Sequence, residues 1–300
     1  MSDWIVSIEG TEAGSNLAMA LALLAALLHA VFGALQKGRH DPWITRAAID
    51  GWLVVLSTPV ALFLVPWPEP HLWPILAGAV VIHFGYKYLQ AQAYSKGAYT
   101  VVYPVVRGTG PLFTVFGAWL IFAEVFTPVQ WLGVMVLMAG LFGLALYNAI
   151  YLVQDRATLR PALAWAVATG LFVALYTTYD AYGIRASADP FTFLAWFFFV
   201  TGIDFPLLVG LGMRHRLSGV ALRPLMARGL IGALVGWFSF GSVMLATRLD
   251  KVGEAAILRE TSTVFAAIIG WLFLKETVGP RRMALMALIA LGAVIVEFGG

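Results

Sequence analysis

Long apolar segments separated by short polar loops recur along the whole chain. A transmembrane α-helix needs about 20 mostly apolar residues, because each residue advances the helix by about 1.5 Å and the hydrocarbon core is about 30 Å thick. Such segments fit in ten places, so the pattern predicts an all-α polytopic membrane protein with ten transmembrane helices. The predicted spans are 17–36, 44–65, 72–94, 98–122, 128–150, 161–184, 190–212, 224–247, 253–274 and 279–298.

Residues typical of helix starts support several of these boundaries. Thr127-Pro128 and Gly279-Pro280 each combine an N-cap candidate with a proline at the first helical position. Asp204 lies inside the seventh span and is a candidate cap for a local break there. Glu124 and Glu276 lie at span ends, where we expect each carboxylate to interact with the positive end of the next helix's dipole.

A segment near the middle of the chain returns in altered form 152 residues later, because residues 105–113 align with 257–265. Duplicated sets of membrane spans are typical of secondary transporters. The third and eighth spans also match, at an offset of 154, so we predict two five-helix repeats, residues 1–152 and 153–300. Since five is an odd number of crossings, the second repeat must run inverted in the membrane.

The composition agrees with a membrane protein. Apolar residues make up 61% of the chain and charged residues only 12%, against about 25% charged residues in ordinary soluble domains. No cysteine is present, so disulfide and thiolate chemistry are excluded. The net charge of +3 is spread over short loops. We therefore expect contact with membrane lipid and no nucleic-acid partner.

Lysine and arginine are distributed unevenly between the two sets of loops. The loops after odd-numbered spans, with their flanks, carry 13 of these residues, and the other side carries only Arg185, Arg248 and Lys251. Cytoplasmic loops are enriched in Lys and Arg. The bias therefore predicts a multi-pass protein of the plasma membrane, the inner membrane in a bacterium, with both termini on the non-cytoplasmic side.

Polar and aromatic side chains inside the spans are the candidate substrate-binding residues. Those spaced by three or four residues share a helix face, which must point to the protein interior or to water because lipid cannot solvate it. Lys87, Arg107 and Arg259 are cations within apolar segments, where a charge is costly and usually functional. The full set is His83, Tyr86, Lys87, Tyr99, Tyr103, Arg107, Tyr176, Tyr179, Asp180, Trp237, Arg259 and Glu260.

Helix-disrupting residues surround Arg107 in the fourth span, namely Pro104, Gly108, Gly110 and Pro111. Interrupted helices near the membrane midplane are the best sequence indication of a transporter site, so we expect a kink or local unwinding here. The equivalent positions around Arg259 lack the prolines but supply hydroxyls. Inversion of the repeats would place the two arginines on opposite sides of the midplane.

Structural roles are the alternative for each of these residues. A buried cation can pair with Asp180 or Glu260 simply to hold helices together, and deep tyrosines are often packing residues with one satisfied hydroxyl. His29 is expected to be a polar contact between helices. Asp50, near an end of the second span, is expected to be solvated.

The closing segments of the two repeats carry a resemblance to a known family. The first reads Pro111-Leu112-Phe113 through Leu120-Ile121-Phe122-Ala123-Glu124, then Gly133 and Gly140. The second reads Phe265 through Leu272-Phe273-Leu274-Lys275-Glu276, then Gly292. With ten predicted spans in 300 residues, the chain resembles the EamA type of the drug/metabolite transporter superfamily. The resemblance implies an exporter of amino acids, other metabolites or drugs, and a YddG-like amino-acid exporter is the nearest assignment.

The leading hypothesis is a secondary transporter that exports small metabolites, above all amino acids including aromatic ones, by alternating access around a central cavity. Lys87, Arg107 or Arg259 would hold the substrate carboxylate, since a guanidinium donates two parallel hydrogen bonds to it. Asp180 or Glu260 would face the amine. The aromatic members of the set would stack on the substrate or face its ammonium group.

Other functions fit the sequence less well. The buried cations also suit an organic-anion carrier for phosphonate- or sugar-phosphate-like solutes, and drug efflux is a further alternative. An integral-membrane enzyme is disfavoured, because the chain has neither a zinc-binding HExxH motif nor a nucleophile elbow. No Walker loop, cofactor site or metal site is recognisable. Proton coupling would use His83, Asp180 or Glu260, and a uniporter is equally compatible.

Overall fold

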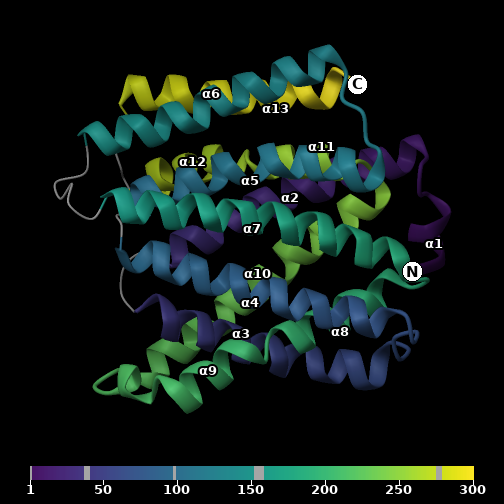
Figure 1. The fold of residues 1–300 in the computed structure, drawn as a ribbon, viewed down its shortest axis with the longest axis vertical. Coiled ribbons are helices and arrows are strands. Elements are labelled where there is room, and N and C mark those ends of the chain that lie inside the picture. Colours follow the sequence, from purple (N-terminus) through teal and green to yellow (C-terminus); the bar gives the residue numbers. More distant parts are fainter. Residues whose placement is uncertain (1, 37–40, 97–98, 152–158, 275–278) are drawn as a thin grey trace.

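The computed structural model describes residues 2–36, 41–96, 99–151, 159–274 and 279–300 (Figure 1). Within these ranges it describes the backbone alone at residues 33–36, 99–101, 159, 267 and 270–274. The predicted roles of Glu276 and of the Tyr99 side chain therefore lie outside the described residues.

The regular secondary structure of the described residues is all helical. A π-helical turn, η1 (Val60–Leu64), continues α3, and a 3₁₀ turn, η2 (Arg214–Leu217), follows α9. The α-helices are α1 (Ser2–Ser7), α2 (Glu12–Gln36), α3 (Pro42–Pro59), α4 (Leu72–Lys96), α5 (Tyr99–Phe122), α6 (Pro128–Tyr151), α7 (Leu159–Ala186), α8 (Pro190–Thr201), α9 (Asp204–Gly212), α10 (Leu222–Leu249), α11 (Val252–Arg259), α12 (Ser262–Leu274) and α13 (Pro280–Phe298).

Helical backbone occupies each of the ten predicted spans. Among the described residues, eight helical segments are long and apolar enough to cross a membrane. They are formed by α2, α3 with η1, α4, α5, α6, α7, α8 with α9, and α10. A chain with this many membrane-crossing segments is a multi-pass membrane protein.

The interruption predicted in the fourth span lies elsewhere in the structure. α5 is continuous through Arg107 despite the two prolines inside it, so of the two expectations there the local unwinding is wrong and the kink stays a prediction. Membrane helices tolerate proline where neighbouring helices and hydroxyl groups satisfy the freed carbonyl groups. The break lies instead at the equivalent place of the second repeat, where α11 ends at Arg259 and α12 begins at Ser262. There the chain tightens into three-residue turns, in which the amide of Glu260 donates to the carbonyl of Ile257 at 2.9 Å.

The seventh span is also divided, as the position of Asp204 predicts. α8 ends at Thr201 and α9 begins at Asp204, whose carboxylate accepts a hydrogen bond from the amide of Phe205 at 2.6 Å. Gly202 lies in this break, and a Cβ atom here would lie 3.0 Å from the carbonyl oxygen of Asp50. Glycine therefore lets α3 approach the break closely enough for its side chains to enter the site.

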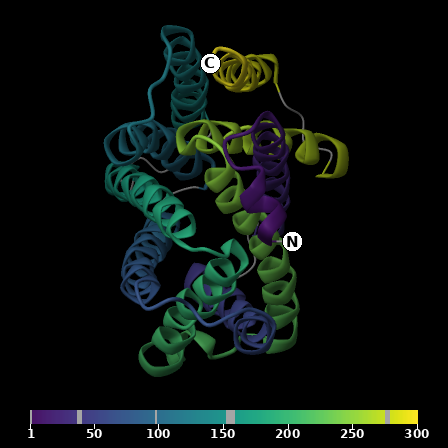
Figure 2. The same ribbon diagram turned by 90° about the vertical axis from the view of Figure 1, so that its right-hand side faces the viewer.

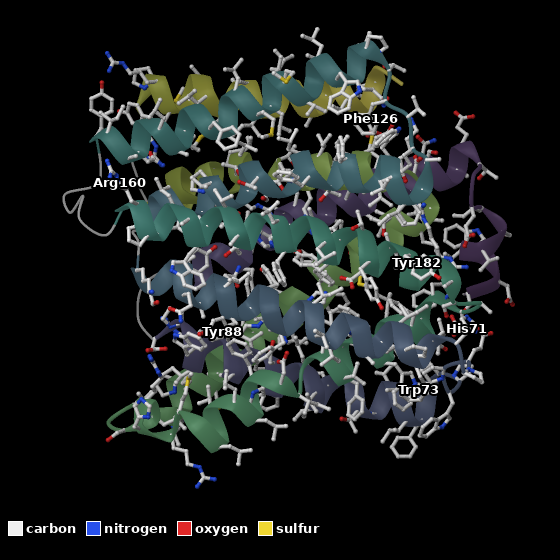
Figure 3. The ribbon with its side chains drawn as sticks, in the orientation of Figure 1. His71, Trp73, Tyr88, Phe126, Arg160 and Tyr182 are labelled. Atoms are coloured by element: carbon white, nitrogen blue, oxygen red, sulfur yellow. The ribbon has the colours of Figure 1, made fainter. Side chains whose placement is uncertain are left out.

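The helices lie side by side, with both termini at the same end of the molecule (Figure 1). α6 and α13 pack together at one edge, and α3 and α9 lie at the opposite edge (Figure 2). Between these edges, α2 packs against α10 and α12, while α7 packs against α4 and α5. Figure 3 places His71 at the end that holds the termini and Arg160 at the opposite end. We call these the terminal end and the basic end.

Glycines allow the close contact between α6 and α13. A Cβ atom at Gly292 would lie 2.6 Å from the carbonyl oxygen of Gly133, and one at Gly140 would lie 2.8 Å from the carbonyl oxygen of Leu285. Small residues at membrane helix interfaces let the backbones approach, which strengthens packing where no hydrophobic effect drives association. The repeated glycine at these equivalent positions thus has a packing role.

We predict that Gly292→Ala lowers the thermal stability of the purified protein, because the added methyl group must push α6 and α13 apart. Overpacking of this kind costs about 1–3 kcal/mol. Gly210→Ala is the matched control, since a Cβ atom at Gly210 in α9 meets no atom within 4 Å. Thermal unfolding in detergent measures both variants, and equal melting temperatures would contradict the packing role of Gly292.

Candidate functional site

An internal cavity of about 100 Å³ lies among α2, α3, α4, α7, α8, α10 and α11. We call it the main cavity. Its lining includes five of the predicted site residues, His83, Tyr86, Lys87, Tyr176 and Arg259. It also includes His29 and Asp50, which the sequence did not place among the binding residues.

Lys87 on α4 is the centre of a charge cluster at the basic end of the main cavity. Its Nζ lies 2.8 Å from a carboxylate oxygen of Asp50 on α3 and 2.8 Å from one of Asp204 on α9. It also donates a hydrogen bond to the carbonyl of Thr201, which the break after α8 leaves free. Arg46, one helical turn before Asp50, completes the cluster at 2.9 Å. Two cations and two carboxylates therefore neutralise one another and join three helices.

This cluster corrects the prediction for Asp50. The residue is fully buried rather than solvated, because the folding of α8 and α9 against α3 closes water off from that part of the span. The spacing of Arg46 and Asp50 by four residues on one helix is a sequence signal that could have indicated the pair. The partnership with Lys87 and Asp204 depends on tertiary contacts and has no such signal.

Arg107 on α5 is also paired inside the protein. Its Nε lies 3.0 Å from a carboxylate oxygen of Glu260, and its Nη2 donates to the hydroxyl of Ser262 at 2.7 Å. Nη2 also lies 3.3 Å from the carbonyl oxygen of Arg259, the equivalent residue of the other repeat. The break between α11 and α12 thus provides the groups that accept from Arg107. The ion pair of Arg107 with Glu260, considered above as a structural alternative, is present in the structure.

Arg259 is buried and forms no ion pair of this kind among the described residues, although its charge interacts at longer range with the carboxylates of Asp180 and Glu260. It is 4% exposed and lines the main cavity. Its Nε has no hydrogen-bond partner, and no ion pair among the described residues includes its guanidinium. A buried cation in this condition favours an anionic group of a ligand, since leaving it unpaired is costly.

His83 and Asp180 connect α4 to α7. The imidazole Nε2 lies 2.7 Å from Asp180 Oδ2, and both side chains are buried. Asp180 Oδ1 has no hydrogen-bond partner among the described residues. Asp180 lines a second cavity of about 10 Å³, the small cavity, together with Arg259. A carboxylate oxygen and a guanidinium Nε that both lack a hydrogen-bond partner among the described residues therefore belong to side chains that border the same space.

Aromatic rings form much of the wall between these charged groups. The ring of Tyr176 lies 4.8 Å from that of His83 and 4.8 Å from that of Tyr86, measured between ring centres. Phe197 and Phe240, which the sequence prediction missed, stack at 5.7 Å and both line the main cavity. Their positions in long apolar segments do not distinguish them from lipid-facing phenylalanines.

The remaining predicted residues take structural positions. Tyr103 lies beside the site, where the guanidinium of Arg107 is 5.7 Å from its ring centre. The hydroxyl of Tyr179 occupies the space that a side chain at Gly78 would fill, so Tyr179 packs α7 against α4. Trp237 is half-buried and contacts Phe198 edge-on rather than lining either cavity.

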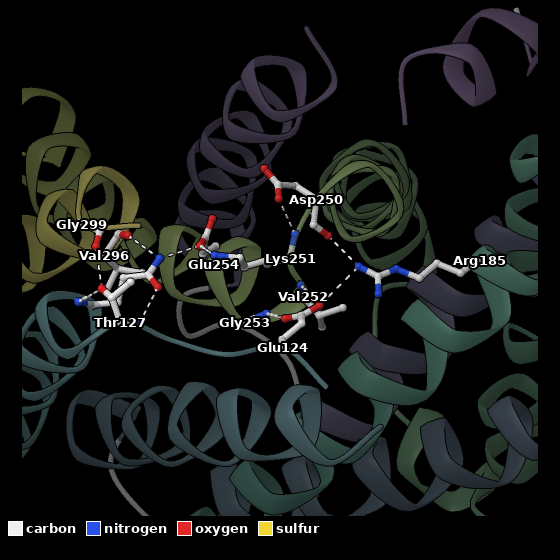
Figure 4. A network of polar contacts seen from close by, with 11 residues as sticks. Glu124, Thr127, Arg185, Asp250, Lys251, Val252, Gly253, Glu254, Val296 and Gly299 are labelled. Carbon is white, nitrogen blue, oxygen red and sulfur yellow. Dashed lines mark hydrogen bonds and ion pairs between the residues drawn. The ribbon is translucent and has the colours of Figure 1, made fainter. Parts of the chain in front are cut away.

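At the terminal end, Glu124 binds the start of the helix that carries Arg259 (Figure 4). Its carboxylate oxygens accept hydrogen bonds from the amides of Val252 at 2.8 Å and Gly253 at 3.1 Å. A carboxylate at a helix N-terminus is stabilised by free amides and by the helix dipole. Glu124 thus binds a helix N-terminus, but the prediction that this would be the next helix along the chain is wrong, because the helix is α11 in the other repeat.

Arg185 extends this contact toward the small cavity. It donates to the carbonyl of Asp250 at 2.7 Å and to that of Thr247 at 2.8 Å, and it lies 3.4 Å from Glu124. Thr247 lines the small cavity. Glu124, Arg185 and the start of α11 thus form an ion-paired contact on the terminal side of the small cavity, and the cluster around Lys87 forms one at the main cavity.

The geometry describes a small space in the middle of a bundle of membrane helices, with walls that are mainly apolar and aromatic and with ion pairs on two sides of it. The fold and the site thus define a multi-pass membrane protein with buried charged groups around a central cavity. No group of three or more His, Cys, Asp or Glu side chains suited to a metal ion is found among the described residues.

Comparison with known proteins agrees with this class. A sequence profile of the EamA-like transporter family matches residues 16–146 and again residues 160–298, so the chain belongs to that family. A crystal structure described only as "Crystal structure of protein" superposes with a TM-score of 0.70. That structure is 16% identical in sequence, and the match covers 96% of this chain and 99% of the other. A search of curated proteins finds no significant match. The family consists of small-molecule transporters rather than enzymes.

We predict that Asp50→Asn destabilises the fold by about 3 kcal/mol, because it leaves Arg46 and Lys87 with one buried carboxylate between them. Adding Lys87→Gln to this variant restores part of the loss, since the second substitution removes the excess cation. Unfolding of both variants in detergent provides the measurement. Glu12→Gln, at an exposed position, is the control. If the Asp50→Asn variant without the second substitution is as stable as this control, the cluster does not hold α3, α4 and α9 together.

Proposed function

We propose that the protein is an alternating-access carrier that exports small zwitterionic metabolites, foremost amino acids. The observation that supports this most directly is that two oppositely charged side chains border the small cavity and that one atom of each, Nε of Arg259 and Oδ1 of Asp180, has no hydrogen-bond partner among the described residues. A substrate carboxylate would bind Arg259, and its ammonium group would bind Asp180. One amino-acid head group thus supplies the partners that the protein leaves missing.

The charge balance of the site also favours a zwitterion. The four Lys and Arg side chains and the four Asp and Glu side chains of the site cancel in formal charge, so a zwitterion adds no net charge to them, whereas an anion adds a negative one. A net charge in a low-dielectric interior is costly. The eight groups are Arg46, Lys87, Arg107, Arg259, Asp50, Asp180, Asp204 and Glu260.

The size and the walls of the main cavity support a small apolar or aromatic side chain on the substrate. Pockets for drug-sized ligands enclose about 300–1,000 Å³, and the main cavity encloses about 100 Å³ in this conformation. Its apolar wall includes Phe197, Phe198 and Phe240. Rings in this arrangement stack on aromatic groups and bury aliphatic ones. These features favour amino acids over bulky drugs.

An organic-anion carrier is the second candidate. Three cations line the main cavity, Arg46, Lys87 and Arg259, against one carboxylate, Asp50. Two of these cations already contact carboxylates within the protein, which leaves only Arg259 for a ligand. The zwitterion is therefore the better fit, and a carrier for organic anions would bind phosphonates or sugar phosphates more tightly than amino acids.

We propose further that residues 1–152 and 153–300 form two inverted repeats that rock around the site. The packing supports a two-fold relation, because α2 contacts α10 and α12 as α7 contacts α4 and α5. The family profile also matches each half separately. Rocking would open the ion pairs at one end while those at the other stay closed, and a substrate shifts this equilibrium only by binding one state more tightly.

The orientation follows from the distribution of charge. Lys and Arg concentrate at the basic end, which we propose faces the cytoplasm of a bacterial cell, with both termini on the outside. Substrate would then enter past the cluster around Lys87 and leave past Glu124 and Arg185.

The proposed binding site predicts the behaviour of two variants. Arg259→Gln removes the carboxylate partner and Asp180→Asn the ammonium partner, so each should reduce saturable amino-acid uptake by at least about tenfold, a change worth about 1.4 kcal/mol. Uptake of labelled amino acids into proteoliposomes is the measurement, and Arg281→Gln, at an exposed position, is the control.

The outcomes separate the two substrate classes. If wild-type protein takes up no amino acid but binds phosphonates or sugar phosphates, the zwitterion proposal fails and the anion carrier replaces it. If Arg259→Gln transports amino acids as well as wild type, the proposed site is wrong even though the substrate class stands.

We propose that the pair of His83 and Asp180 binds a coupling proton. Its two members border different cavities, and an ammonium group arriving at Asp180 Oδ1 would repel a proton shared between His83 and Asp180. The cations Arg46, Lys87 and Arg259 line the same cavity as His83. Binding of substrate and release of the proton would then be linked.

This coupling predicts that a pH gradient increases amino-acid accumulation by wild-type proteoliposomes several-fold. His83→Gln, which keeps a hydrogen-bond donor beside Asp180 but does not titrate, should lose this stimulation while still exchanging labelled for unlabelled substrate. If amino-acid accumulation by wild-type protein is the same with and without the pH gradient, the protein is instead a uniporter.

A further inference from the structure

The main cavity and the small cavity share one wall. Four residues border both spaces, Tyr176, Phe240, Val243 and Arg259. The small cavity, at about 10 Å³, has room for about one water-sized group, and an ammonium group has that size. The rest of any substrate held by Arg259 must therefore extend into the main cavity.

Phe240 on α10 is the bulky apolar member of this wall. The centre of its ring lies 5.6 Å from that of His83, 5.6 Å from that of Tyr176 and 5.7 Å from that of Phe197. It also packs against each of the three largest groups of buried apolar side chains among the described residues. Its ring is thus held on several sides and stands between the two cavities.

The position of this ring determines the path of a substrate side chain. A carboxylate at Arg259 and an ammonium group at Asp180 fix the head group, so the substituent on the α-carbon must pass along Phe240. A substrate side chain displaces such a ring less readily than it would displace an aliphatic side chain, because the aromatic neighbours that pack around the ring would have to move as well.

We infer that Phe240 determines the size of the side chain that the carrier accepts. The head group of the substrate is bound separately, by Arg259 and Asp180. The inference rests on the proposed function. It assigns substrate selectivity to one residue on α10, and it places the limit on size at the wall between the cavities rather than at the charged cluster around Lys87.

Two substitutions of opposite size test this assignment. Phe240→Ala joins the cavities and should raise the ratio of tryptophan to alanine transport about tenfold, the change expected for one small difference in an apolar pocket. Phe240→Trp should lower the same ratio. Phe238→Ala is the matched control, because Phe238 lies on the same helix and is 59% exposed on the outer surface.

Uptake of labelled alanine, leucine and tryptophan into proteoliposomes gives the ratios, after size-exclusion chromatography has shown that each variant is folded. If the alanine variant does not fold, Phe240→Leu replaces it and should shift the ratio in the same direction. If wild type transports amino acids but the Phe240 variants show the same transport ratios as Phe238→Ala, the role of Phe240 is wrong and the proposed function stands. Wild-type protein that transports none of the three would overturn the proposed function and this inference together.

Discussion

A charged side chain within a membrane has no water to solvate it, so it must find a partner inside the protein or remain available for a ligand. This constraint organises the whole interior of the chain. The side chain of Lys87 contacts two carboxylates, and that of Arg107 contacts Glu260. Each of these contacts ties together helices that are distant in sequence. Arg259 differs from them, because its guanidinium forms no ion pair among the described residues and its Nε has no hydrogen-bond partner there.

The breaks in the helices supply the partners that this constraint demands. At the end of α8 the chain leaves the carbonyl of Thr201 to accept from Lys87, and at the end of α11 it leaves the carbonyl of Arg259 to accept from Arg107. Each cation is thus matched by backbone as well as by carboxylate. Irregular backbone at this depth is tolerated only where it is buried in protein or lines a cavity, and both conditions are met here.

Much of the fold is predictable from the chain because long apolar segments and their capping residues are local features. The helix boundaries follow from them to within a few residues, and Asp204 indicates the break in the seventh span. The partners of charged residues are not local. Asp50 looks solvated from its place in the sequence but is buried by α8 and α9. Arg107 and Arg259 are equivalent in the repeat, so no sequence pattern reveals which of them is already paired.

The shortness of α11 has a mechanical consequence. The helix has eight residues, about 12 Å of rigid rod, with Glu124 of the other half holding one end and Arg259 at the other. A rod this short cannot bend appreciably, so movement of its anchored end reorients the guanidinium at its tip. Under the proposed function, a separation of the two halves at the terminal end would therefore also displace the group that binds the substrate, although Glu124 itself lines neither cavity.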